Sequence, residues 1–192
     1  MGLEYELKYR ATPEILQAVG RDFPGEYAVK QMRTAYYDTP GAELSARHWT
    51  LRCRRENDVY VCTLKLPADS GARGEWETRC EDIARAVPVL AAESGCDELE
   101  ALTRQGLVNT CGAEFVRRCR VLTVGKTTLE LALDQGILSG GGKTLDFAEL
   151  ELELLEGSRE DVARLGKLLE ASYGLDPEKK SKFARAKALR EE

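Results

Sequence analysis

Polar and apolar residues alternate along most of the chain. In TLELALD at 128–134, Leu129, Leu131 and Leu133 fall on one side of an extended strand and the polar residues fall on the other. The segment AELELEL at 148–154 repeats this pattern, with a glutamate between successive leucines. Strict alternation over such lengths indicates a half-buried β-strand and not a helix. The chain is therefore predicted to be mainly β.

The strand pattern recurs eight times, with turn residues between the repeats. We expect strands at residues 2–10, 28–38, 48–55, 58–66, 73–80, 112–122, 127–134 and 144–155. Other stretches have helical periodicity and start signals such as Thr12-Pro13 and Ser158. We expect helices at 13–20, at 82–104 in one or more pieces, at 159–172 and at 181–190. The predicted fold class is α+β and mainly β, with enough strands for an antiparallel closed β-barrel and helices packed outside.

The breaks between the strands contain residues that tolerate positive φ. Asn57-Asp58 within 56–58 and the glycines of 135–143 predict hairpin turns. The stretch 67–74 (PADSGARG) predicts a loop between two further strands. Because no internal repeat or long linker interrupts the sequence, residues 1–192 are predicted to form a single domain.

Nearly every predicted strand has one charged side. Glu149, Glu151 and Glu153 share a side of one strand, and Arg52 and Arg54 share a side of another. Like charges on one face repel each other unless cations or opposite charges lie among them. For any single strand, a solvated face is the favoured explanation of such charges, because one polar face is usual in antiparallel sheets. Across the whole set, the unusual share of Glu and Arg favours charged sides that face a shared, hydrated bore, with helices covering the leucine sides.

Composition and charge limit the possible partners. The chain is 43% hydrophobic and 32% charged, which is typical of a globular protein, and its formal net charge is −5. Neither a basic surface for nucleic acid nor an apolar membrane span is indicated, and the N-terminus lacks the pattern of a secretory signal. We therefore expect a cytoplasmic protein with no nucleic-acid or membrane partner. The six cysteines have no CxxC spacing, which favours free thiols.

The charged strands also carry the motifs of a known family. EYELK at 4–8 fits the ExExK signature of the CYTH superfamily, the triphosphate tunnel metalloenzymes. Further motifs follow in the family's order: YYDTP at 36–40, LRCR at 51–54, TLK at 63–65, RGEWE at 73–77, RRCR at 117–120, ELALDQG at 130–136, ELELE at 149–153 and SKFARA at 181–186. The chain resembles this family over essentially its whole length. It is most similar to the bacterial inorganic triphosphatase branch.

The resemblance implies both a fold and an activity. The implied fold is an eight-stranded antiparallel closed β-barrel, the triphosphate tunnel, and the implied cofactor is Mg²⁺ or Mn²⁺. The expected reaction is hydrolysis of inorganic triphosphate (tripolyphosphate) to diphosphate and phosphate by a metal-activated water, in a monomer or homodimer. Alternatives are hydrolysis of an organic triphosphate, nucleoside or thiamine triphosphate, and class IV adenylyl cyclase activity. A non-catalytic polyphosphate binder is the alternative outside the enzymes.

A highly charged triphosphate requires several cations along its length, and Arg matches phosphate oxygens bidentately. The residues expected to bind it are Lys8, Arg52, Arg54, Lys65, Arg118 and Arg120, with Lys182 and Arg185 closing one mouth. The expected metal ligands are Glu4, Glu6, Glu149 and Glu151, with Glu130 and Asp134 as further candidates. Glu75 and Glu77 are expected to hold a second ion or to orient the attacking water, and they complete a catalytic set with Lys8, Arg52, Arg54 and Lys65.

Two other motifs are predicted to be structural. Asp38 in YYDTP is expected to cap a turn before Pro40 instead of binding metal. The GKT sequences at 124–128 and 140–144 lack the glycine spacing of a phosphate-binding P-loop and are predicted to be turns.

Overall fold

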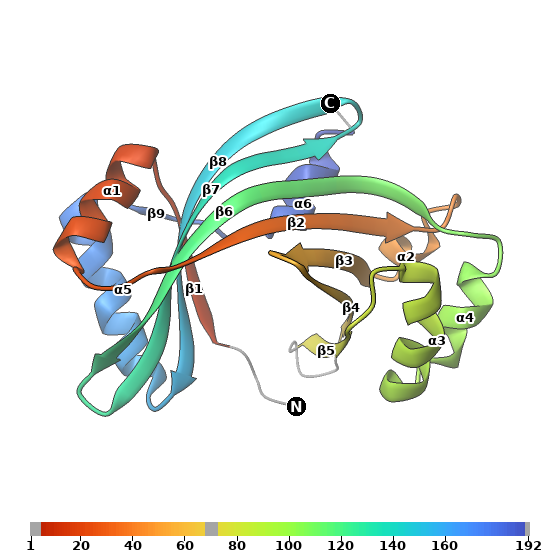
Figure 1. The fold of residues 1–192 in the computed structure, drawn as a ribbon, viewed down its shortest axis with the longest axis horizontal. Coiled ribbons are helices and arrows are strands. Elements are labelled where there is room, and N and C mark those ends of the chain that lie inside the picture. The colour runs from red at the N-terminus through yellow and green to blue at the C-terminus, as the bar shows by residue number, and fades with distance from the viewer. Residues whose placement is uncertain (1–4, 68–72, 191–192) are drawn as a thin grey trace.

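One strongly curved antiparallel sheet forms the centre of the molecule (Figure 1). The computed structural model describes residues 5–67 and 73–190, and the sheet in that part of the chain has nine strands. They are β1 (Glu6–Arg10), β2 (Ala28–Asp38), β3 (Thr50–Glu56), β4 (Val59–Pro67), β5 (Arg73–Thr78), β6 (Val108–Val124), β7 (Thr127–Gly140), β8 (Lys143–Glu156) and β9 (Asp176–Pro177). Their order across the sheet is β5-β4-β3-β2-β6-β7-β8-β1-β9.

The predicted eight strands are present, and the α+β, mainly β class is confirmed. The prediction of an eight-stranded closed barrel is wrong, because β9 is a ninth strand and, within the described residues, the edge strands β5 and β9 do not pair. The cause lies in the register of the long strands. On β2, β3 pairs only with Met32–Tyr37, whereas on the far side of the sheet β1 pairs with Glu149–Glu153 of β8. The two edges therefore lie toward opposite ends of the arch.

Six helices accompany the sheet in the described part of the chain. They are α1 (Pro13–Asp22), α2 (Glu43–Ala46), α3 (Ile83–Ser94), α4 (Asp97–Thr103), α5 (Arg159–Tyr173) and α6 (Lys182–Ala188). The predicted helices at 13–20, 159–172 and 181–190 are confirmed, and the stretch 82–104 forms two helices. Gly95 ends α3 with a φ of 69°, a conformation that glycine adopts without strain. The short α2 was not predicted.

Helix starts follow the predicted signals. The Thr12 hydroxyl accepts a hydrogen bond from the backbone N–H of Ile15, and Pro13 occupies the first turn of α1. Ser158 caps α5 in the same way by accepting from the N–H of Glu160. Such caps satisfy N–H groups that the first helical turn leaves without a partner.

The turn between β7 and β8 is tighter than predicted. Strand β7 continues to Gly140 and β8 begins at Lys143, so the predicted turn over 135–143 is wrong. Only Gly141 and Gly142 form the turn, with φ of 59° and 76°. The charged alternation stops near Gln135, and beyond it Leu138 packs in an apolar cluster with Ala186 of α6. The turn at Asn57 and both GKT turns are confirmed. The loop predicted at 67–74 lies largely outside the described residues.

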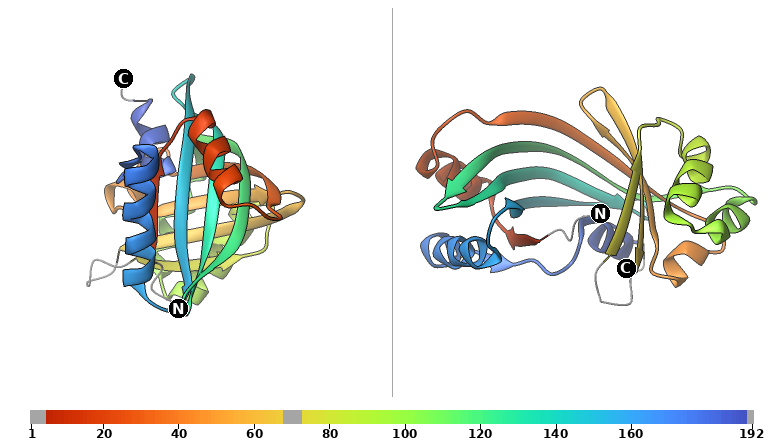
Figure 2. Two further views of the ribbon diagram at one scale, coloured as in Figure 1. Left: turned by 90° about the vertical axis from the view of Figure 1, so that its left-hand side faces the viewer. Right: turned by 90° about the horizontal axis from the view of Figure 1, so that it is seen from below.

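Apolar side chains pack on both faces of the sheet. On the outer face, Leu129, Leu131, Leu150 and Leu152 are all 0% exposed and form one cluster with α1 and α5. Helices α2, α3 and α4 cover the outer side of β3 and β4 at the other end (Figure 2). Helix α6 lies inside the curve, where it contacts β6 and β7. The leucine sides are thus covered by helices, as the alternation predicted.

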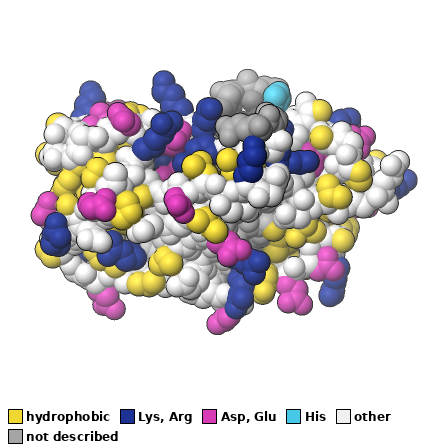
Figure 3. Space-filling view, turned by 90° about the horizontal axis from the view of Figure 1, so that it is seen from above, with side chains coloured by type: hydrophobic (Ala, Val, Ile, Leu, Met, Phe, Trp, Pro, Cys, Tyr) yellow, Lys and Arg dark blue, Asp and Glu magenta, His cyan; other side chains and the backbone are white. Residues whose placement is uncertain are grey.

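One face of the molecule has a mixed surface (Figure 3). Figure 3 shows acidic and basic side chains interspersed with hydrophobic ones on the face seen from above. No helix in residues 5–67 and 73–190 has the length and apolar character needed to cross a membrane.

Candidate active site

The charged strand faces meet in one cavity of about 690 Å³ inside the curve of the sheet. Register aligns them: Lys8 lies opposite Glu151 across β1 and β8, and Lys65 lies opposite Glu75 across β4 and β5. Among the described residues that line the cavity, the charged ones are Lys8, Arg52, Arg54, Lys65, Arg117, Lys182, Glu6, Glu75, Glu77, Glu151 and Glu153. The charged sides therefore converge as the sequence predicted, although in an open channel instead of a closed tunnel.

Strands β3, β4 and β5 supply a basic wall. Lys65 Nζ lies 2.6 Å from Glu75 Oε2, and Arg52 Nη2 lies 3.4 Å from Glu75 Oε1. Arg54 donates from Nε to the Thr34 hydroxyl at 3.3 Å, and it forms no ion pair with any carboxylate of the described residues. Burial, together with the nearby Arg52 guanidinium, lowers the pKa of Arg54 to about 10. Among the described residues, the positive charge of Arg54 on this wall has no carboxylate partner.

Strands β1 and β8 supply an acidic wall opposite. Glu6 faces Glu153 directly across the two strands, and Glu130 of β7 faces Glu153 from the other side. Burial raises the pKa of Glu6, and the neighbouring Glu151 raises it further. Lys8 Nζ forms an ion pair with Glu6 at 3.7 Å, which opposes the shift without outweighing burial and Glu151. Glu153 was absent from the predicted ligand set, although the ELELE alternation had placed it on this face. Glu4 lies outside the described residues.

A second group of carboxylates lies deeper and is already paired. Oxygens of Asp134, Glu149 and Glu151 lie within 4.8 Å of one another, a spacing that a divalent cation could bridge. Lys182 of α6 lies 2.9 Å from Asp134 and 2.7 Å from Glu151, and it also bonds Glu149. Burial opposes charge here, but Lys182 and Arg117 outweigh it and lower the pKa of Glu151 to about 2. Burial raises the pKa of Glu149.

The arginines of β6 correct the sequence prediction. Arg118 and Arg120 were expected in the bore, but they project from the outer face and stack over Tyr27 at 5.8 and 5.7 Å. Arg120 also donates to the Phe23 carbonyl at 3.2 Å. Arg117 points into the cavity instead. Because a shift of one residue reverses the face of a strand, the motif RRCR is compatible with either register, and sequence reasoning missed Arg117.

Helix α6 carries the two basic residues expected at a mouth of the tunnel. Lys182 is 9% exposed and sits among the carboxylates, and Arg185 pairs with Glu149. Arg185 Nη1 also lies 3.9 Å from Glu178. Lys182 and Arg185 thus anchor α6 against the inner face of the sheet.

The comparison with known families agrees with this geometry. The model of the CYTH domain matches residues 2–186. This chain belongs to the CYTH domain family. The resemblance predicted from EYELK and the later motifs is therefore confirmed.

The relatives of this CYTH domain include enzymes. A Haemophilus influenzae protein named inorganic triphosphatase is 27% identical over 170 residues, which are 83% of this chain and 47% of the relative. The chain therefore spans about half the length of that relative. The solved structure of PH1819 from Pyrococcus horikoshii OT3 has a TM-score of 0.60 and 23% identity, covering 98% of this chain and 99% of that one. HpAC1 from Hippeastrum, a candidate adenylyl cyclase described as having a dominant triphosphatase activity, has a TM-score of 0.64 and 21% identity, covering 97% and 96%.

The donor set of this CYTH domain fits a hard divalent cation. Mg²⁺ and Mn²⁺ prefer carboxylate oxygens, and Glu6, Glu151 and Glu153 bring three carboxylates to one wall of the cavity. Burial, reinforced by the Glu151 carboxylate, raises the pKa of Glu6 although Lys8, Lys182 and Arg117 oppose the shift, so a divalent cation beside Glu6 would favour its ionised form. The deeper group around Asp134 is balanced by Arg117, Lys182 and Arg185.

Asp38 has the structural role that the sequence predicted. Its Oδ1 accepts from the N–H groups of Thr39 at 2.8 Å and Leu44 at 2.9 Å, and its Oδ2 accepts from Ser45 at 3.1 Å. These bonds hold the turn and the start of α2. Asp38 therefore caps local structure and is not a ligand in the cavity.

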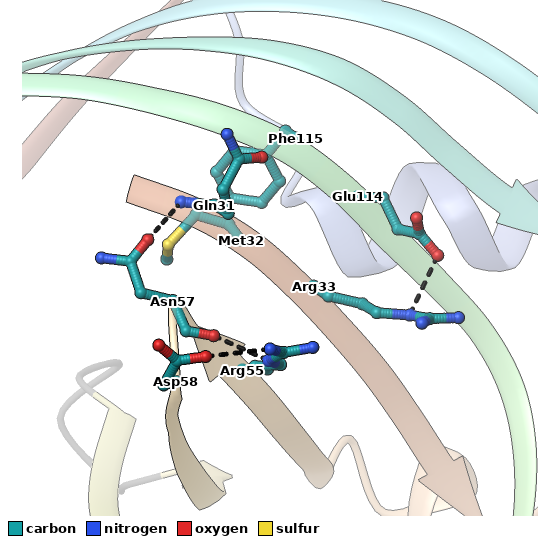
Figure 4. Close-up of a pocket in the computed structure, with 8 residues that line it drawn as sticks. All are labelled: Gln31, Met32, Arg33, Arg55, Asn57, Asp58, Glu114 and Phe115. Carbon is teal, nitrogen blue, oxygen red and sulfur yellow. Dashed lines mark hydrogen bonds and ion pairs between the residues drawn. The ribbon is translucent and has the colours of Figure 1, made fainter. Parts of the chain in front are cut away.

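A second hollow of about 430 Å³ lies beside the β3–β4 turn (Figure 4). Its polar groups bind one another: Asn57 accepts from the Gln31 N–H at 2.9 Å, and Arg55 pairs with Asp58 at 3.0 Å. Because these groups satisfy each other at the surface, we place the candidate active site in the charged cavity.

Proposed function

We propose that this CYTH domain hydrolyses inorganic triphosphate to diphosphate and phosphate, with Mg²⁺ or Mn²⁺ as cofactor. The observation that carries the proposal is the pair of opposed walls. Arg54 faces the cavity without a carboxylate partner in the described residues, and Glu6 lies on the other wall beside Glu151. A polyanion would balance the positive charge of the basic wall, and a divalent cation between the polyanion and the carboxylates would balance the negative charge of the acidic wall.

The basic wall would bind the phosphate chain. Arg52 has a buried Nε without a hydrogen-bond partner in the described structure, and Arg54 bonds Thr34 through its Nε, which leaves its two Nη groups available to a ligand. Guanidinium groups bind phosphate oxygens in pairs, whereas Lys8 and Lys65 act as point charges. Preorganised cations of this kind stabilise the charge that accumulates on a departing diphosphate.

The acidic wall would hold the cation. We assign Glu6, Glu151 and Glu153 to it, with the predicted ligand Glu4 as a further candidate. When bound, such a cation supplies a nucleophilic water near neutral pH and neutralises phosphate charge. Glu151 lines the cavity although it also pairs with Lys182 and Arg117, whereas Glu149 and Asp134 are not among its described lining residues, so we assign these two to positioning Lys182 and Arg117. Glu130 remains a candidate through its place beside Glu153.

One carboxylate on the basic wall is suited to orient the attacking water. Glu75 is engaged by both Lys65 and Arg52. The side chain of Glu77 is 51% exposed and accepts only one close bond, from the Thr63 hydroxyl at 3.0 Å, among the described residues. Of the two, Glu77 has the greater capacity to accept a hydrogen bond from water. We therefore assign it the orienting role.

The alternative of an organic triphosphate has one observation in its favour. Tyr36 and Phe183 line the cavity as an aromatic pair with ring centroids 4.9 Å apart. An aromatic surface beside a phosphate site can stack a nucleobase or a thiazolium ring. The Haemophilus influenzae relative named inorganic triphosphatase supports the inorganic substrate.

A substrate panel tests the proposal. Phosphate release is measured from tripolyphosphate, ATP and thiamine triphosphate, each with Mg²⁺, with Mn²⁺ and with a chelator. The proposal predicts metal-dependent release that is fastest with tripolyphosphate. A faster rate with ATP or thiamine triphosphate would favour the alternative, and binding without release from any of them would make the protein a polyphosphate binder.

A further inference from the structure

Two cysteines face each other across β3 and β4. Cys53 and Cys62 are directly opposite in the antiparallel register, and both thiols reach the same acceptor, the Cys80 carbonyl. Directly opposed residues in such a ladder have Cα atoms about 4.5 or 5.5 Å apart, and disulfides span about 4.4–6.8 Å. A bond between these sulfurs is therefore compatible with the existing strand pairing.

A third cysteine adjoins the pair but does not complete a metal site. The Cys80 carbonyl oxygen accepts from Cys62 Sγ at 3.1 Å and from Cys53 Sγ at 3.7 Å, while the Cys80 thiol donates to the Asp82 carbonyl at 3.2 Å. Within the described residues, the one group of three metal-binding side chains is the carboxylate group around Asp134. The thiols of Cys53 and Cys62 therefore meet at one acceptor, while the Cys80 thiol bonds elsewhere.

The surroundings of the pair limit which reagents reach it. Cys62 is 0% exposed and Cys53 is 8% exposed, and both belong to the apolar cluster beneath α3. Burial raises the pKa of both thiols, so they are protonated at neutral pH and react slowly. A reagent of about the size of water, such as hydrogen peroxide, has the best access, and Cys53 is the more accessible of the two sulfurs.

We infer that Cys53 and Cys62 form a reversible disulfide bond when the folded protein meets a hydroperoxide. The Cys53 sulfur attacks one peroxide oxygen, the O–O bond breaks, and the leaving hydroxide takes the thiol proton and departs as water. This leaves a sulfenic acid on Cys53. The Cys62 sulfur then attacks the Cys53 sulfur, the S–O bond breaks, and the hydroxide leaves with the Cys62 proton as a second water. Two thiols are oxidised and one hydrogen peroxide is reduced; a small thiol reverses the bond by exchange.

The pair is placed to affect the basic wall. Cys53 lies between Arg52 and Arg54 on β3, and Cys62 precedes Thr63, which holds Glu77. Formation of the disulfide would shift the side chains of Arg52, Arg54 and Thr63, which these two strands carry on the opposite face. Weaker triphosphate binding in the oxidised protein would follow. This consequence rests on the proposed function, whereas the disulfide itself does not.

Mass spectrometry tests the bond directly. Folded protein is treated with hydrogen peroxide, remaining thiols are alkylated under denaturing conditions, and a chymotryptic digest separates the two cysteines by cleavage after Tyr60. We expect a mass loss of about 2 Da, one for each thiol proton, and a cross-linked peptide pair containing Cys53 and Cys62 that dithiothreitol separates. Cys53→Ala and Cys62→Ala should each abolish the cross-link. Cys111→Ala, a change at a buried cysteine in another cluster, should retain it.

Several results would overturn the inference. All six thiols remaining open to alkylation after peroxide treatment would do so, as would a cross-link through Cys80 or one that forms only in unfolded protein. If the cross-link forms while the KM for tripolyphosphate stays unchanged, the coupling to the basic wall is wrong although the bond stands. Absence of any triphosphatase activity would contradict the proposed function alone, because the cross-link is scored without substrate.

Discussion

Arg117 of β6 donates two hydrogen bonds to Asp134 of β7, from Nε to Oδ1 and from Nη2 to Oδ2, each 2.7 Å long. Asp134 is 0% exposed, and Lys182 Nζ approaches its Oδ2 at 2.9 Å. Burial opposes the charge of Arg117, but Asp134 and Glu151 outweigh it and raise its pKa. The bidentate pair thus joins the middle of the sheet to the residue that anchors α6.

Replacing this arginine should destabilise the fold. Arg117→Gln leaves the buried Asp134 carboxylate without its bidentate partner, and breaking a buried ion pair from one side costs about 3–5 kcal/mol in free energy of unfolding. Urea denaturation measures the loss. Arg118→Gln is the matched control, because this neighbour lies on the outer face over Tyr27 and should cost about 1 kcal/mol or less. Equal losses in the two variants would refute the burial argument.

Glu178 should make stability depend on acidic pH. Burial alone would raise its pKa, but the hydrogen bonds from Arg10 Nε at 2.7 Å and from the Lys180 N–H at 2.8 Å outweigh burial and lower it. A carboxylate whose pKa is lower in the folded state stabilises the fold above its unfolded pKa, about 4.3, and loses that contribution as pH falls through the folded pKa.

The variant Glu178→Gln tests the sign of this dependence. The difference in unfolding free energy between wild type and variant should be largest above pH 5 and should shrink as pH falls below about 4.3, because protonated Glu resembles Gln. Denaturant titrations across this range measure it. Glu93→Gln, a change at an exposed position of α3, should show a much smaller difference. A Glu178→Gln difference that grows on acidification would contradict the assignment.

Ionised Glu6 should lower the free energy of unfolding and should nevertheless be necessary for activity. Because burial and Glu151 raise its pKa, its ionised form is disfavoured in the fold, so Glu6→Gln should retain or increase the free energy of unfolding in the absence of metal. Phosphate release from tripolyphosphate should nevertheless fall by about 100-fold or more, the usual effect of removing one preorganised polar group.

Glu114→Gln is the control for that pair of measurements. Glu114 lies on the outer face of β6, where it pairs with Arg33 at 3.0 Å and is 55% exposed. Both rate and stability should stay close to wild type. Full turnover by Glu6→Gln at saturating Mg²⁺ or Mn²⁺ would remove Glu6 from the metal site.

Much of the fold follows from alternation along single strands, and what does not follow depends on contacts between strands. The period of two in TLELALD and AELELEL is a local property, so it identified the strands and their leucine sides. Closure of the sheet depends on where β1 and β3 pair along the long strands, which local pattern does not specify. The strand β9 has two residues and carries no periodic signal.

The site residues also fall into those that local alternation predicts and those that depend on contacts between elements. Alternation along single strands was enough to predict which basic side chains face the cavity, because the apolar side of each strand is unambiguous. These residues are Lys8, Arg52, Arg54 and Lys65. In RRCR, arginines lie on both faces of the strand, so the sequence could not show whether Arg117 or the pair Arg118 and Arg120 faces the cavity. The pairing of Lys182 with buried carboxylates depends on where α6 docks, and the sequence of this seven-residue helix does not indicate that position.

The most direct test of the charged cavity compares two adjacent arginines of β3. Arg54 faces the cavity without a carboxylate partner in the described residues, whereas Arg55 points away and pairs with Asp58 at 3.0 Å. Metal-dependent phosphate release from tripolyphosphate is measured for Arg54→Gln and Arg55→Gln beside wild type. We predict a loss of about 100-fold for Arg54→Gln and less than about twofold for Arg55→Gln. A wild-type rate in Arg54→Gln, or equal losses in both variants, would show that the charged cavity is not where triphosphate reacts.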